Sequence, residues 1–115
     1  MNPIVFDSNI LFSSLRSKDS TLLSLVEMRK DCVFYTPNFL VVEIFKHRER
    51  LRAKSKLTED EFLELLSILL RSIRFYNESM ISGGNLLEAW RLVRDIDPKD
   101  QLFVALALEL DAQLL

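Results

Sequence analysis

Short apolar runs alternate with stretches of helical periodicity along the chain. The runs are rich in β-branched and aromatic side chains, which predicts buried strands over residues 4–6, 33–35 and 73–76. Between and after them, apolar positions recur every three to four residues, as on one face of a helix. This spacing predicts helices over residues 8–15, 21–30, 39–47 with an extension past His47, 58–70, 84–93 and 102–110.

Local start signals mark three of these helices. Thr36-Pro37 predicts a cap followed by proline in the first turn, and Asp97-Pro98 has the same form. Thr58 with Glu61 three residues later predicts a capping box. The helix over 102–110 is apolar nearly all round, so we expect it to be buried, and Trp90 is expected in the core.

Strands that alternate with helices favour parallel pairing, because the connection between two parallel strands must cross a face of the sheet. The sequence therefore predicts an α/β fold, a three-layer α/β/α sandwich with a central parallel sheet. Residues 4–6 are apolar throughout and predict a central strand. Ligands of such sheets bind beyond the carboxyl ends of the strands, and Asp7 directly follows the first strand.

Composition narrows the class of protein. The 115 residues, 49% of them hydrophobic and 28% charged, fit a single domain over residues 1–115 without a membrane-spanning run. The start of the chain lacks a signal-peptide pattern and Cys32 is the single cysteine, so we expect a cytoplasmic protein with Cys32 buried. Gly83 and Gly84 are the only glycines, which excludes dinucleotide-binding and P-loop motifs. The net charge of −2 means that any nucleic acid must be bound through a local patch or a metal.

Three acidic residues stand in apolar surroundings: Asp7, Glu43 and Asp100. If folding brings them together, their mutual repulsion favours a divalent cation, and clustered carboxylates suit Mg²⁺ or Mn²⁺. Each also has a structural interpretation. Asp7 can cap a helix, Glu43 can pair with Lys46 or His47 at helical spacing, and Asp100 can favour a helix N-terminus.

A basic run follows Glu43. It contains Lys46, Arg48, Arg50, Arg52, Lys54 and Lys56. The run predicts a phosphate-binding patch, for which we select Lys46, Arg48 and Arg50, or else a solvated helix end balanced by the acids after Thr58. His47 is interpreted as a surface residue or an RNA contact, since Glu43 and His47 alone do not make a zinc site.

The motifs together resemble a PIN domain. They are Asp7-Ser8-Asn9 after an apolar strand, Glu43 in a largely apolar helix, and Asp97-Pro98-Lys99-Asp100 ahead of an Ala-x-Ala helix. In this order they are similar, over the whole chain, to the PIN-domain ribonucleases that include the VapC toxins. The resemblance implies an endoribonuclease dependent on Mg²⁺ or Mn²⁺, with Asp7, Glu43 and Asp100 as the catalytic, metal-binding carboxylates. It also implies a fourth metal ligand in Asp97, for which capping is the alternative, and a polar pair, Ser8 and Asn9, that shapes the RNA site.

The resemblance also implies partners: an RNA substrate, an antitoxin protein and a second copy in a homodimer. PIN domains are similar in carrying one more acidic residue after a further strand, and this chain ends at Leu115, where that strand is expected to begin. We therefore expect a C-terminally incomplete domain that binds one metal ion weakly and cleaves little or no RNA alone. The alternative function is a catalytically inert PIN-like module that binds a protein partner. A phospho-acceptor receiver domain is disfavoured, because it needs paired acids where Ser8 follows Asp7.

Overall fold

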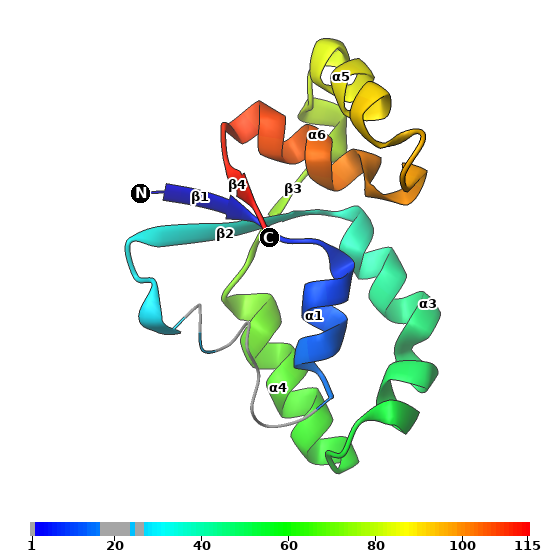
Figure 1. Ribbon diagram of the computed structural model, residues 1–115. Helices are drawn as coiled ribbons and strands as arrows, with labels where there is room; N and C mark the ends of the chain where they lie inside the picture. Colours follow the sequence, from blue (N-terminus) through cyan, green and yellow to red (C-terminus); the bar gives the residue numbers. More distant parts are fainter. Residues whose placement is uncertain (1, 17–23, 25–26) are drawn as a thin grey trace.

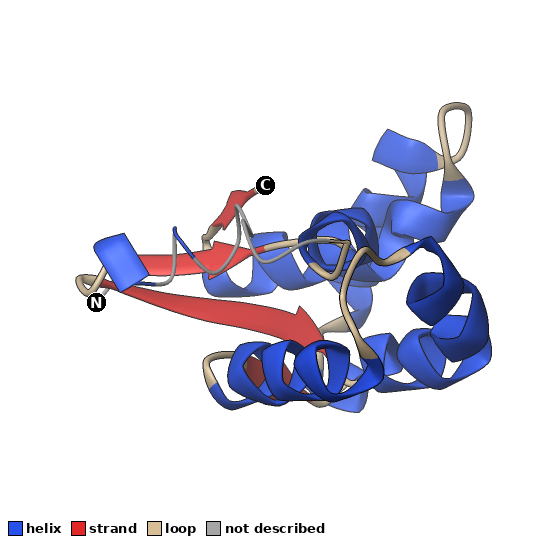
Figure 2. Ribbon diagram, turned by 90° about the horizontal axis from the view of Figure 1, so that it is seen from below, coloured by secondary structure: helices blue, strands red, loops and turns tan. Residues whose placement is uncertain are grey.

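A four-stranded parallel sheet forms the centre of the molecule. The computed structural model describes residues 2–16, 24 and 27–115. The strands are β1 (Asn2–Val5), β2 (Cys32–Pro37), β3 (Arg74–Tyr76) and β4 (Gln113–Leu114). Their order is β3-β2-β1-β4, and every neighbouring pair is parallel. The two longest strands run the same way in Figure 2. The predicted parallel sheet and the inner position of the first strand are confirmed.

Helices cover both faces of the sheet. The helices α1 (Ser8–Ser14), α3 (Phe39–Lys54) and α4 (Glu59–Arg71) lie on one face, and α5 (Gly83–Val93) and α6 (Gln101–Leu110) lie on the other (Figure 1). This is the predicted three-layer α/β/α arrangement.

Alternation along β1 supplies both cores. Ile4 belongs to the hydrophobic cluster under α1, α3 and α4, whereas Val5 belongs to the cluster under α5 and α6. Successive side chains of a strand point to opposite faces, so consecutive apolar residues such as Ile4 and Val5 are expected where a strand is buried on both faces. Cys32 is buried in the first cluster, as predicted.

One predicted boundary is wrong. Thr36 and Pro37 belong to β2, where they pair with Phe75 and Tyr76 of β3, and α3 begins only at Phe39. The first turn of α3 is capped from a distance, since the Phe39 N–H donates to Glu78 Oε2 at 2.7 Å. The local pattern of Thr36-Pro37 resembled a helix start, but strand pairing and this long-range cap decide the boundary.

Other helix signals are borne out. The capping box of Thr58 and Glu61 is formed, and α3 extends past His47 to Lys54. The prediction that Trp90 lies in the core is wrong: 41% of it is exposed. The reason is that α5 buries the side formed by Ala89 and Val93, and Trp90 does not lie on that side.

The helix predicted over residues 21–30 falls mostly outside the described residues. Within it, Ser24, Glu27 and Met28 are helical. Among the helices of the described residues, none has the length and apolar character needed to cross a membrane.

Candidate active site

A cavity of about 400 Å³ lies beyond the carboxyl end of β1, where the starts of α1, α3 and α6 meet. We call it the acidic cavity because three carboxylates contribute to its wall: Glu43, Asp97 and Asp100. Its full lining comprises Ser8, Asn9, Phe12, Phe39, Glu43, His47, Arg50, Asp97, Lys99, Asp100 and Phe103. The fold therefore gathers residues from three distant parts of the sequence at the edge of the sheet where ligands of parallel sheets bind.

Asp7 connects β1 to this site as the N-cap of α1. Its Oδ1 accepts a hydrogen bond from the Ile10 N–H at 3.1 Å, which fixes the carboxylate at the start of the helix. Asp7 is half-buried and does not itself line the cavity. Its negative charge nevertheless acts on Asp100, so the two carboxylates lie within electrostatic range.

Asp97 and Asp100 come from a short 3₁₀ turn, Pro98–Asp100, ahead of α6. Asp97 caps that turn, since its Oδ1 accepts the Lys99 N–H at 3.1 Å. Asp100 stands at the start of α6, but its side chain makes no capping hydrogen bond. Burial raises the pKa of Asp100 above its ordinary value, and the negative charges of Asp97 and Asp7 raise that pKa further. The carboxylate of Asp100 is therefore less favourable in its charged form than an exposed aspartate is.

Glu43 enters the cavity from α3. Its Oε2 lies 3.2 Å from His47 Nε2, one helical turn away, and about three-quarters of each side chain is buried. The ring of Phe12 meets His47 edge-on, with centroids 6.0 Å apart and planes at 74°. Phe12 and Glu43 together hold His47 between them, and the interpretation of His47 as a pure surface residue is corrected.

The structure places one of the three selected basic residues at the acidic cavity. Arg50 lines it, whereas Arg48 lines a different cavity beside α4, and Lys46 is exposed and lines neither. Helix geometry explains why Arg48 is separated from Arg50, since positions two apart on a helix point about 200° apart. It does not account for Lys46, which is four residues before Arg50, about 40° away around the helix, and is not in the lining. Arg50 lies seven residues after Glu43, close to two full turns, and so shares its side of α3.

The donor chemistry fits a divalent cation only in part. The negative charges of Asp7 and Asp97 act on Asp100 and raise its pKa. A divalent cation would offset this repulsion, and carboxylate oxygens are donors that suit Mg²⁺ or Mn²⁺. Across the described residues, however, no three His, Cys, Asp or Glu side chains are close enough together to hold a metal ion. The carboxylate of Asp97 accepts a capping hydrogen bond, and the carboxylate of Glu43 contacts His47. Negative charge gathers around Asp100, but the described residues do not form a coordination shell.

Several lining residues were not singled out from the sequence. Lys99 adds a second cation, and Phe39 and Phe103 supply apolar wall. Lys99 stands inside the quoted Asp97–Asp100 motif, so its position next to two acids was a usable signal. Phe39 and Phe103 gave no such signal in the sequence, because apolar residues at helical spacing are ordinary core positions.

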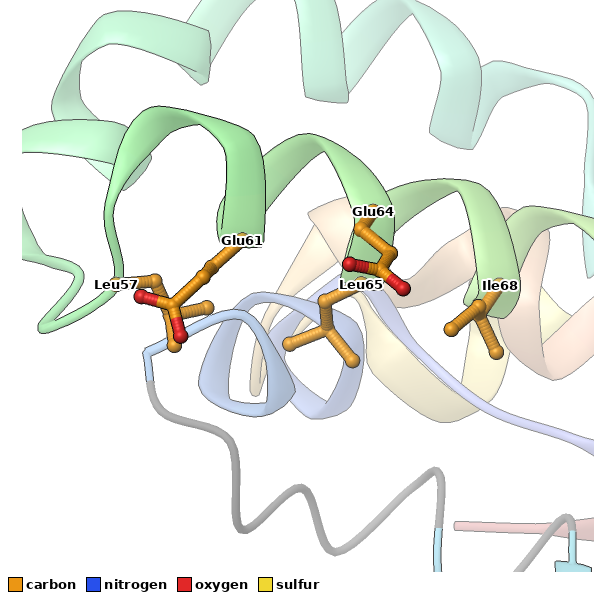
Figure 3. A pocket seen from close by; sticks show the side chains of 5 residues that line it. All are labelled: Leu57, Glu61, Glu64, Leu65 and Ile68. Atoms are coloured by element: carbon orange, nitrogen blue, oxygen red, sulfur yellow. The ribbon is translucent and has the colours of Figure 1, made fainter.

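A second cavity, of about 240 Å³, lies along α4. It is lined by Leu57, Glu61, Glu64, Leu65 and Ile68 (Figure 3). The carboxylate of Glu61 accepts the Thr58 N–H at 3.0 Å as part of the capping box. The rest of the wall is aliphatic apart from Glu64, and this cavity lies on α4, away from the carboxyl end of β1. It is therefore a weaker candidate for chemistry.

Comparison with protein families identifies the class. A family model described as PIN domain matches residues 5–114. Since the match spans nearly the whole chain, the chain belongs to the PIN domain family, whose fold is of the nuclease type. No curated protein matches the chain. The sequence resemblance to PIN domains is thereby confirmed.

Proposed function

We propose that the protein is an endoribonuclease that depends on Mg²⁺ or Mn²⁺ and binds the cation through Asp7, Glu43 and Asp100, with Asp97 as a fourth ligand. The observation that supports the proposal is that Glu43, Asp97 and Asp100 line one cavity beyond the end of β1 in a PIN domain, and that the charge of Asp7 acts on Asp100. When bound, a divalent cation lowers the pKa of a coordinated water and neutralises charge on the scissile phosphate.

The chain's own residues orient and attract the substrate. The Ile10 N–H fixes the carboxylate of Asp7, and His47 fixes that of Glu43. Arg50 and Lys99 place positive charge on the cavity wall, where it counteracts the repulsion between the carboxylates and an RNA phosphate. Ser8 and Asn9 add polar groups that can bond to the sugar-phosphate backbone.

Partners follow from the exposed apolar surface. Val41, Val42 and Phe45 lie on one side of α3 and are 38%, 60% and 68% exposed. Exposed apolar patches mark interfaces. We propose that this surface binds a second copy of the chain, and that the protein is a VapC-like toxin of the cytoplasm with an antitoxin protein as a further partner.

The alternative is a catalytically inert PIN-like module that binds a protein. One observation favours it: within the described residues no three acidic or imidazole side chains are assembled around a metal position. In that case Asp7 and Asp97 serve as caps and Glu43 serves as the partner of His47.

RNA cleavage distinguishes the two functions. The chain is incubated with a labelled single-stranded RNA and either Mg²⁺ or Mn²⁺, alongside Asp7→Asn. Asparagine caps helices as well as aspartate does, so this variant loses the charge while it keeps the fold. We expect weak cleavage that falls by more than about 100-fold in Asp7→Asn.

The matched control is Asp60→Asn, which removes an exposed acid from the first turn of α4 and should leave cleavage unchanged. Cleavage of equal strength in Asp7→Asn would contradict the nuclease proposal, and no cleavage with either metal would favour the interaction module.

A further inference from the structure

Another cavity, different from the one along α4, adjoins the acidic cavity and carries positively charged residues. It measures about 400 Å³ and lies between α1 and α3. Its lining is Asn9, Phe12, Ser13, Arg16, Arg50, Leu51 and Lys54, and we call it the basic cavity. Asn9, Phe12 and Arg50 line both cavities, so the two form one continuous groove.

One side of α3 forms a wall of this groove. Glu43, His47, Arg50 and Lys54 follow one another at intervals of four, three and four residues, close to whole turns of 3.6 residues. Glu43 lines the acidic cavity and Lys54 the basic one, while Arg50 lines both. The wall therefore changes from acidic to basic over about three helical turns.

The facing wall comes from α1 and its end. Asn9, Phe12, Ser13 and Arg16 are spaced as the positions on one side of a helix, three, four and seven residues after the first. Arg16 lies just beyond α1, and its carbonyl oxygen accepts the Lys56 N–H at 2.9 Å. This hydrogen bond holds the end of α1 against the segment that follows α3, and so keeps Arg16 on the same cavity as Lys54.

Within the described part of the chain, the cations of the basic cavity have no acidic partners. Among the residues that the structure describes, no carboxylate lies within 4.0 Å of the charged nitrogens of Arg16, Arg50 or Lys54, whereas Arg29 and Arg91 have such partners. Leu51, 7% exposed, is the buried apolar residue in the lining. Unpaired cations beside amide and hydroxyl groups favour phosphate oxygens as ligands.

We propose that the basic cavity binds the phosphates of a single-stranded RNA next to the phosphate that enters the acidic cavity. The inference rests on the proposed function and names the path of its substrate. A nucleic acid carries one charge per nucleotide, so a strand with one phosphate in the acidic cavity takes neighbouring phosphates into the adjoining one. Continuity of the groove favours such a strand over an acidic protein segment, which has no reason to reach the carboxylates.

Binding without metal tests the proposal. Arg16→Gln with Lys54→Gln removes two positive charges from the basic cavity. The matched control is Arg48→Gln with Arg52→Gln, which removes two charges from the cavity beside α4. Anisotropy of a fluorescent single-stranded RNA is measured in EDTA over a range of salt concentrations, so cleavage plays no part. Thermal unfolding checks that both variants are folded.

We expect the first pair to weaken binding about 10- to 30-fold at 0.1 M salt and to make the slope of log K against log salt about 1.4 shallower, at about 0.7 per phosphate contact. The control pair should change the affinity for RNA less than about threefold.

Unchanged RNA binding by Arg16→Gln with Lys54→Gln, or an equal loss in the control pair, would overturn the proposal and favour a protein partner for the basic cavity. RNA binding that depends on Arg16 and Lys54 without any cleavage would uphold this inference while contradicting the nuclease. Cleavage that depends on Asp7 with unaltered binding by the first pair would do the reverse.

Discussion

At the scale of single residues, three of the four acids of the site have a local structural role. Asp7 caps α1, Asp97 caps the turn before α6, and Glu43 pairs with His47. The sequence indicated both interpretations for these residues but could not choose, because capping and metal binding use the same carboxylate types. In the fold these residues take their structural roles beyond the carboxyl end of β1, at the edge where ligands of parallel sheets bind.

Asp100 is the acid whose environment opposes its charge. Because its pKa is raised, the folded state binds this proton more tightly than the unfolded chain does, so ionisation of Asp100 disfavours folding. We predict that Asp100→Asn raises the stability of the metal-free protein by about 0.5 kcal/mol at pH 7, a small value because solvent screens the charges.

Thermal unfolding against pH measures this difference. The gap between Asp100→Asn and the unmodified chain should close as the pH falls below the ordinary pKa of an aspartate, where Asp100 is protonated in both states. A variant that is less stable than the unmodified chain at pH 7 would show that the Asp100 charge is structurally favourable.

At the scale of elements, periodicity located most helices and strands. The capping box of Thr58, the cap of Asp97 and the central strand were predictable because their signals are local. The start of α3 was not, because it depends on the pairing of Thr36 with Phe75 and on the cap from Glu78. Both contacts join residues that are 39 positions apart in the sequence, so no local pattern can predict them.

The basic run shows a similar limit of local reasoning. Arg48 and Arg50 are close in sequence, but a helix turns them to opposite sides of its axis. Only Arg50 reaches the acidic cavity, and Lys54, further along the same side of α3, accompanies it. The helical period alone separates Arg48 from Arg50 and groups Arg50 with Lys54, but it does not separate Lys46 from Arg50.

Glu109 links the two helices on the second face of the sheet. Its Oε1 accepts the Ser82 N–H at 2.6 Å and the Asn85 Nδ2–H at 3.2 Å at the start of α5, and these bonds lower the pKa of Glu109. We predict that Glu109→Gln lowers the unfolding temperature at neutral pH. A carboxylate whose pKa is lowered by folding stabilises the folded state at pH values above its ordinary pKa. This contribution is lost as the pH falls through the pKa of the folded state, so the difference in unfolding temperature between Glu109→Gln and the unmodified chain should vanish in acid. Calorimetry at pH 7 and near pH 3 checks this, and a gap that persists in acid would refute it.

At the scale of the whole molecule, the alternation of strands and helices was enough to predict three layers. An apolar β1 needs cover on both faces, and the chain supplies it with α1, α3 and α4 on one and α5 and α6 on the other. The exposure of Trp90 was not predictable, because hydropathy alone does not tell which side of α5 faces the sheet.

The exposed side of α3 predicts self-association. We expect a concentration-dependent dimer by light scattering, weakened at least about tenfold in Phe45→Glu, because a charge in an apolar interface costs desolvation energy. Met80→Glu is the control, since Met80 is 69% exposed and Phe45 68%, on different elements. A monomer at high concentration, or equal loss in the control, would contradict the assignment of this surface.

Binding of Mn²⁺ to the full chain tests the central claim most directly, because it asks whether the converging carboxylates hold a cation. The measurement is electron paramagnetic resonance of free Mn²⁺, titrated with the unmodified chain, Asp100→Asn and the control Asp60→Asn. We expect one weak Mn²⁺ site, with an affinity at least about tenfold lower in Asp100→Asn and unchanged in the control. No binding by the unmodified chain, or equal binding by Asp100→Asn, would contradict it.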